Sequence, residues 1–128
     1  MHWKIFISFS LKATVTPPRE ISAMTGIKPF TELIRGERDS ARDLPRSNLW
    51  TVRSTGQQGD SVAKHWQTIE QELVSKIDIF RRLAAEGSAV LTVVVDGPEA
   101  RCPPIEIPPS MSFFAGSIGA IVDIDHLQ

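Results

Sequence analysis

The sequence has one cysteine, no tyrosine and no long apolar run. A single thiol, Cys102, excludes an internal disulfide framework and a zinc site built from cysteines. No apolar stretch reaches the roughly 18 residues that a membrane-spanning helix needs. The remaining composition is that of an ordinary globular protein. We therefore expect a single domain over residues 1–128, located in the cytoplasm.

An excess of charge of one sign is also missing. The chain carries 14 Lys and Arg against 15 Asp and Glu, which gives a formal net charge of −1. Dedicated nucleic-acid binders and polybasic membrane-surface proteins have a clear basic excess. This balance predicts neither a nucleic-acid partner nor a membrane partner.

The opening segment, residues 3–11, predicts a β-strand with one buried face. Its large apolar residues alternate with others: Ile5, Ile7, Phe9 and Leu11. Because successive side chains of a strand point to opposite faces, Phe6, Ser8 and Ser10 should share the other face. The interrupting serines and the following Lys12 also distinguish the segment from a secretory signal.

Further along, helix and strand patterns alternate. Thr16 as N-cap, Pro17 at the first helical position and Gly26 as the stop predict a short helix. A single long helix is expected between a cap at Asp60 or Ser61 and Gly87. It rests on apolar residues at three- and four-residue spacing: Val62, Trp66, Ile69, Leu73, Ile77, Phe80 and Ala84. Strands are expected at 31–35, 49–54, 89–95 and 120–125, and a second short helix at 109–116.

This order, β-α-β-β-α-β followed by α-β, predicts the α+β fold class. The first six elements match a ferredoxin-like βαββαβ core, with helices on one face of a mainly antiparallel sheet. The last helix and strand would form a C-terminal αβ extension. A different α+β sandwich is the alternative.

Three segments resemble a known bacterial family. They are residues 20–29 (EISAMTGIKP) with Arg35-Gly36-Glu37, residues 47–54 (SNLWTVRS), and the helix end at 83–87 with the strand after it and the closing 121–125 (IVDID). Together they resemble the bacterial domain-of-unknown-function 4279 family, a set of small α+β proteins, over almost the whole chain. The resemblance implies no catalytic residues. For small bacterial domains of this kind it suggests an immunity or partner-neutralising role.

Residues 36–47 predict a charged surface loop. Arginines recur in and beside this loop, but acidic residues interleave with them, which is typical of a solvated face. The most promising ligand-binding candidates lie near this loop and the third predicted strand: Trp50, Arg53, Arg35 and Arg38. A deep pocket there would favour a small-ligand sensor or an enzyme.

Chemistry-bearing residues elsewhere form no convincing catalytic set. Asp123 and Asp125 would share one strand face and are the candidate metal ligands, while His126 would point the other way. Two carboxylates leave most ligand positions empty, so we expect no bound metal and no cofactor. His65 should lie on the surface, and Cys102 has no neighbouring sequence typical of a thiol enzyme.

The sequence thus favours a non-catalytic binding or interaction module over an enzyme. With helices on one side of the sheet only, an apolar opposite face would be left open to solvent and would favour a partner. That partner would be another protein or, through a homodimer on the open sheet face, a second copy of this chain.

Overall fold

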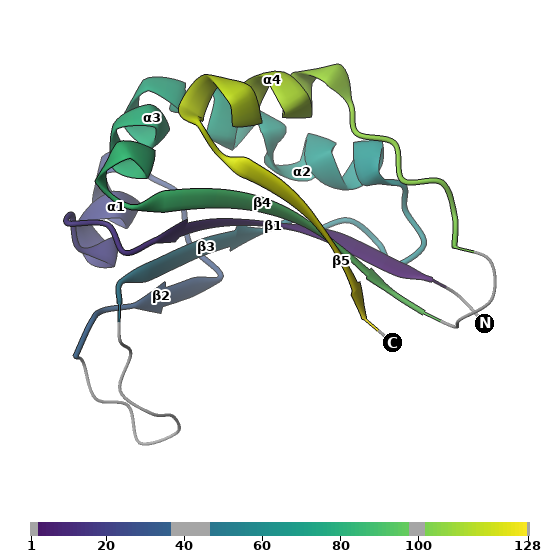
Figure 1. Ribbon diagram of the computed structural model, residues 1–128, viewed down its shortest axis with the longest axis horizontal. Coiled ribbons are helices and arrows are strands. Elements are labelled where there is room, and N and C mark those ends of the chain that lie inside the picture. Colours follow the sequence, from purple (N-terminus) through teal and green to yellow (C-terminus); the bar gives the residue numbers. More distant parts are fainter. Residues whose placement is uncertain (1–2, 37–46, 98–101, 128) are drawn as a thin grey trace.

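The computed structural model describes residues 3–36, 47–97 and 102–127, and these form an α+β protein (Figure 1). The described helices are α1 (Pro18–Thr25), α2 (Val62–Val74), α3 (Ile77–Glu86) and α4 (Pro109–Ile118). The described strands are β1 (Lys4–Lys12), β2 (Thr31–Leu33), β3 (Leu49–Arg53), β4 (Ser88–Asp96) and β5 (Ile121–Leu127). The strands were therefore predicted to within two residues at each end.

The five strands form one mixed sheet in the order β2-β3-β1-β4-β5. β1 pairs antiparallel with both β3 and β4, and β2 pairs antiparallel with β3. β5 pairs parallel with β4, which requires the crossover through α4. The described helices all cover the same face of the sheet, and no described helix covers the opposite face, which we call the open face (Figure 1).

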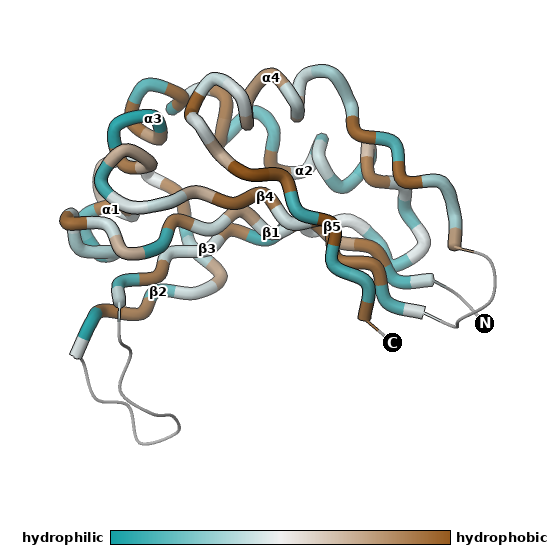
Figure 2. The backbone as a smooth tube through the Cα atoms, in the orientation of Figure 1, coloured by the Kyte–Doolittle hydropathy of each residue, from teal (hydrophilic) through white to brown (hydrophobic). Residues whose placement is uncertain are grey.

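The hydrophobic core lies between the sheet and the helices. The predicted alternation along β1 is confirmed: Ile5, Ile7, Phe9 and Leu11 are buried, whereas the residues between them are only partly buried. Along β5, hydrophobic and hydrophilic residues alternate less regularly, and every residue of that strand is exposed (Figure 2). The first and last strands of the chain therefore differ in position, because β1 is the central strand of the sheet and β5 is an edge strand.

The predicted single long helix is two helices. α2 ends at Val74 and α3 begins at Ile77, with Lys76 in a non-helical conformation (φ −115°, ψ 24°). The Ser75 hydroxyl donates to the carbonyl oxygen of Glu72 (3.1 Å), a local bond that competes with helical pairing. The apolar spacing runs unbroken across the junction, so periodicity alone did not reveal the break.

The start of α1 also differs from the prediction. Pro17 is the N-cap, one residue later than expected, and Pro18 is the first helical residue. Thr16 binds Glu86 at the end of α3 instead, through its backbone N–H (2.8 Å) and its hydroxyl (3.0 Å). The predicted stop is confirmed, because Gly26 adopts the left-handed conformation (φ 70°).

The described helices are short. In the part of the chain that the structure describes, none combines the length and the apolar character that crossing a membrane requires.

Candidate functional site

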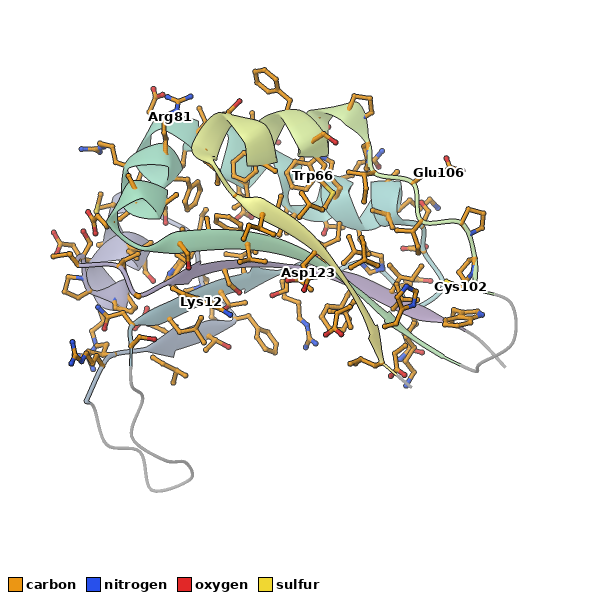
Figure 3. All side chains as sticks on the ribbon, in the orientation of Figure 1. Lys12, Trp66, Arg81, Cys102, Glu106 and Asp123 are labelled. Atoms are coloured by element: carbon orange, nitrogen blue, oxygen red, sulfur yellow. The ribbon has the colours of Figure 1, made fainter. Side chains whose placement is uncertain are left out.

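The open face of the sheet brings together residues from four strands. The pairing of neighbouring strands aligns Arg53 of β3, Ser8 of β1, Thr92 of β4 and Asp123 of β5 in one row. Paired residues in a sheet project to the same side. Figure 3 shows Asp123 on the side of the sheet away from the helices. The row therefore crosses the open face from a cation at one side to a carboxylate at the other.

Arg53 is held in place by two aromatic rings. Its guanidinium carbon lies 3.7 Å from the ring centroid of Phe6 and 4.5 Å from that of Phe30, both within cation–π range. Phe30 is 63% exposed, and its backbone N–H donates to the carbonyl oxygen of Thr51 (2.7 Å). Stacking on aromatic faces leaves the N–H groups at the edge of the guanidinium directed to solvent. Within the described ranges, no carboxylate forms an ion pair with Arg53.

The open face is mixed in character, whereas the sequence had predicted an apolar one. Hydroxyl groups occupy its centre, and those of Ser10 and Thr51 lie 3.1 Å apart in a mutual hydrogen bond. Val90 and Ile121 add apolar surface beside them. This mixture of charged, polar and apolar side chains is typical of a solvated protein surface rather than of an exposed core.

The other predicted ligand residues do not join Arg53. Trp50 is completely buried, and its indole N–H donates to the hydroxyl of Ser22 (3.0 Å) on the helical side. Arg35 lies beyond the end of β2, close to the start of β3, whereas Arg53 ends that strand. The backbone N–H of Arg35 donates to Asn48 Oδ1 (2.8 Å). Arg38 and positions 37–46 of the predicted charged loop lie outside the described residues.

The two aspartates of β5 share the open face. Asp123 pairs with Thr92 and Asp125 with Val94, whereas His126 pairs with Val95 and projects to the helical side. Over residues 3–36, 47–97 and 102–127, no three His, Cys, Asp or Glu side chains gather closely enough to hold a metal ion. Cys102 is half-buried, and its thiol donates to the carbonyl oxygen of Pro103 (3.3 Å).

His65 is buried, so its prediction as a surface residue is wrong. Its Nε2 lies 2.8 Å from the carbonyl oxygen of Gln57, and its Nδ1 lies 2.8 Å from Ser54 Oγ. A carbonyl only accepts, so Nε2 carries the proton and Nδ1 accepts from the Ser54 hydroxyl. Ser54 Oγ accepts in turn from the backbone N–H of Ile7 (2.8 Å). All these groups are satisfied, which makes the Ser54–His65 pair a structural clamp between β1, β3 and α2.

Removal of the Ser54 hydroxyl tests this clamp. Ser54→Ala leaves the Ile7 N–H and His65 Nδ1 buried without their partner, so we expect the free energy of unfolding to fall by about 2 kcal/mol. Ser8→Ala removes a hydroxyl from the open face and should change it by less than about 0.5 kcal/mol. Urea titration measures the free energy of unfolding of both variants, and an equal change in the two would contradict a structural role for the Ser54–His65 pair.

Three cavities lined by described residues do not include Arg53. A cleft of about 570 Å³ lies between the start of β1, the N-terminus of α2 and residues 103–106. Trp3 and Pro103 contribute apolar walls, and Asp60 and Glu106 contribute carboxylates. Asp60 Oδ2 already accepts from the backbone N–H of Gln57 (2.9 Å). Two further cavities are lined by residues of α2 and of the α1 end, so none of the three includes the predicted ligand residues.

Comparison with known proteins supports the family resemblance and adds no activity. A family model described as a domain of unknown function, DUF4279, matches residues 3–128. No curated protein and no solved structure matches the chain. The three segments singled out from the sequence lie within the matched range. The chain belongs to the DUF4279 family.

Proposed function

We propose that this protein is a non-catalytic protein-binding module. Its contact surface is the open sheet face, its anchor is Arg53, and its occupant is another protein that presents an acidic side chain to that arginine. The observation that carries the proposal is the guanidinium held between Phe6 and Phe30 without a carboxylate partner in the described ranges. A guanidinium fixed in this way is preorganised to bind a carboxylate with two hydrogen bonds.

The surroundings of Arg53 fit a protein partner better than a small ligand. Arginine and aromatic residues are enriched at the centres of protein interfaces. A small molecule is usually enclosed in a cavity, and the three cavities described above do not include Arg53. The sensor or enzyme alternative therefore has less support than a binding module.

Charge placement narrows the kind of partner. Arg53 lies on β3, and Asp123 and Asp125 lie three strands away on β5. With strands about 4.8 Å apart, the opposite charges are separated by roughly 14 Å. A complementary surface carries an acidic group and a basic group at that spacing. Such recognition supports a partner-neutralising role of the kind suggested for small bacterial domains.

A ferredoxin-like core is also part of the proposal. The order β4-β1-β3-β2, with every neighbour antiparallel, supports the split βαβ arrangement predicted for the first six elements. Helices then cover one face only, and β5 extends the sheet. This arrangement accounts for a broad face that stays open for a partner.

Site-specific photo-crosslinking in the native host tests the proposal. A photoreactive residue replaces Ser8 on the open face or, as the control, Gln67 on the exposed side of α2. We expect one protein to be captured through position 8 and not through position 67. Capture through neither position contradicts the proposal. Cross-linking between two copies, with a dimer in light scattering, would replace the partner by self-association.

The captured partner then allows a quantitative test of Arg53. Truncation of a central interface arginine typically costs about 2 kcal/mol, so Arg53→Ala should weaken binding about 30-fold. Arg53→Lys keeps the charge but loses the planar stacking, so its affinity for the partner should lie between that of the natural protein and that of Arg53→Ala. Arg82→Ala removes an exposed arginine from α3 and should have no effect. Equal affinities for Arg53→Ala and Arg82→Ala would overturn the role of Arg53.

A further inference from the structure

β5 is an edge strand whose outer side is unoccupied in the described part of the chain. The sheet order places β4 on one side of it, and all 7 of its residues are exposed. Figure 1 shows β5 at the edge of the sheet, passing in front of the other strands in this view, with α4 above it and no described strand beside its outer edge. An exposed edge presents backbone N–H and C=O groups that can pair with another extended chain.

The carboxylates of β5 disfavour an acidic added strand but not a basic one. Lys, Arg and Pro, which commonly prevent edge pairing, are absent from Ile121–Leu127. Val122 and Ile124 project to the helical side and are each 37% exposed. Asp123 and Asp125 project to the open side. An added strand would therefore meet aliphatic side chains on one face and carboxylates on the other.

A second copy of β5 is a poor occupant because it would oppose like charges. In a two-fold antiparallel pair centred on Ile124, Asp123 of each copy faces Asp125 of the other. Shifting the register by two residues places Asp123 against Asp123 or Asp125 against Asp125. Like charges directly opposite each other destabilise a strand pair. The charge pattern thus disfavours self-pairing and favours a segment of opposite charge.

β2 is the other edge strand of the sheet and is less suitable for pairing with an added strand. It has only 3 residues, Thr31–Leu33, and the hydroxyl of Ser22 donates to Glu32 there (2.7 Å). β5 offers more than twice that length of backbone. Of the two edges, β5 therefore has the greater capacity to bind an extended chain.

We infer that β5 is a docking site for an extended segment of a partner protein with Lys or Arg at alternate positions and aliphatic residues between them. Backbone pairing along the edge supplies affinity, as in other cases of strand addition. Basic side chains opposite Asp123 and Asp125 fix the register and the face. The inference does not depend on Arg53. Asp123 and Asp125 also belong to the open face, but the inference goes beyond the open-face proposal because it adds backbone pairing along the outer edge of β5.

Synthetic peptides provide the probe. The test peptide alternates lysine and valine over nine residues. A second peptide has the same composition with the lysines clustered at one end, and a third has glutamate in place of lysine. Fluorescence anisotropy measures affinity, and amide chemical-shift changes locate the site. We expect the alternating peptide to bind about tenfold more tightly than the clustered one, with shifts concentrated on 121–127, and the acidic peptide not to bind.

Variants separate strand addition from general charge attraction. Asp123→Asn with Asp125→Asn should weaken the alternating peptide about tenfold or more. Glu70→Gln with Glu72→Gln removes the same charge from α2 and should leave its affinity unchanged. Arg53→Ala should also leave it unchanged, so that failure of either proposal is distinguishable from failure of the other. All five substituted positions are exposed or half-buried, and thermal unfolding checks that each variant is folded.

The backbone contribution has its own control. An alternating peptide N-methylated at every second residue keeps its charges but loses donors along one edge. Loss of binding supports strand addition to β5. Undiminished binding, shifts centred outside 121–127, or no binding of the unmodified peptide would each overturn the inference.

Discussion

Phe80→Ala is expected to lower the free energy of unfolding by about 4 kcal/mol, the largest effect of any substitution considered. The Phe80 ring is completely buried and contacts three other aromatic rings. Its centroid lies 5.2 Å from that of Phe9, 5.8 Å from that of Trp50 and 6.2 Å from that of Phe114. Truncation removes the side chain that joins α3 to both β1 and α4. Chemical denaturation followed by far-UV circular dichroism measures the loss.

Phe113→Ala is the matched control for this prediction. Phe113 precedes Phe114 in α4 but is 71% exposed, so the same truncation should change stability by less than about 0.5 kcal/mol. Native domains have a total stability of about 5–15 kcal/mol, and Phe80→Ala alone would remove a large share of it. A loss below about 1 kcal/mol would show that the aromatic cluster can collapse around the vacancy.

Gly87→Ala is expected to cost about 3 kcal/mol because two backbone segments approach closely at this residue. A β-carbon at Gly87 would collide with the carbonyl oxygen of Lys12 and would lie 2.7 Å from the carbonyl carbon and oxygen of Ala13. The segment after β1 cannot move away easily. The Ala13 N–H donates to Asn48 O (2.8 Å), and Thr16 is bonded to Glu86. The midpoint of thermal unfolding should fall accordingly.

Gly116→Ala is the control for this prediction, because alanine at this second glycine should raise the stability rather than lower it. Gly116 lies within α4, and a β-carbon there would meet open space. Alanine is a better helix former by about 0.5–1 kcal/mol, so this variant should be slightly more stable than the natural protein. Equal stability of Gly87→Ala and the natural protein would mean that the β1–β4 junction can separate without cost.

Local sequence patterns predicted the elements of this fold, and the failures have physical causes. Alternation along β1 requires only that one face be buried, and it located Ile5, Ile7, Phe9 and Leu11 correctly. Helical spacing cannot distinguish one helix from two when the apolar phase continues across Ser75 and Lys76, as it does here. His65 was misplaced because its burial depends on two hydrogen-bond partners in the loop before α2.

The candidate site was only partly accessible from the sequence. Arg53 is a candidate from the sequence because it lies in the third predicted strand, 49–54, near the charged loop 36–47. Its two stacking partners were not found, since they depend on the register of β1 against β3 and on the path of the chain before β2. A phenylalanine directly after Pro29 and outside any buried pattern is the signal that could have indicated Phe30. Trp50 is a candidate because it lies in the same predicted strand, but residues three apart in a strand face opposite sides, and Trp50 is buried on the helical side.

The central position of β1 also has a consequence for the synthesis of the protein on the ribosome. Both strands that pair with β1 come later in the sequence, and the pairing with β4 extends to Asp96. At synthesis rates of about 5–20 residues per second, roughly 4–17 seconds pass between the addition of Lys12 and that of Asp96. Until Asp96 has been added, β1 lacks the complete strand β4, one of the two strands that flank it in the folded sheet. The nascent chain therefore exposes a hydrophobic segment to which general chaperones can bind until β4 has been synthesised.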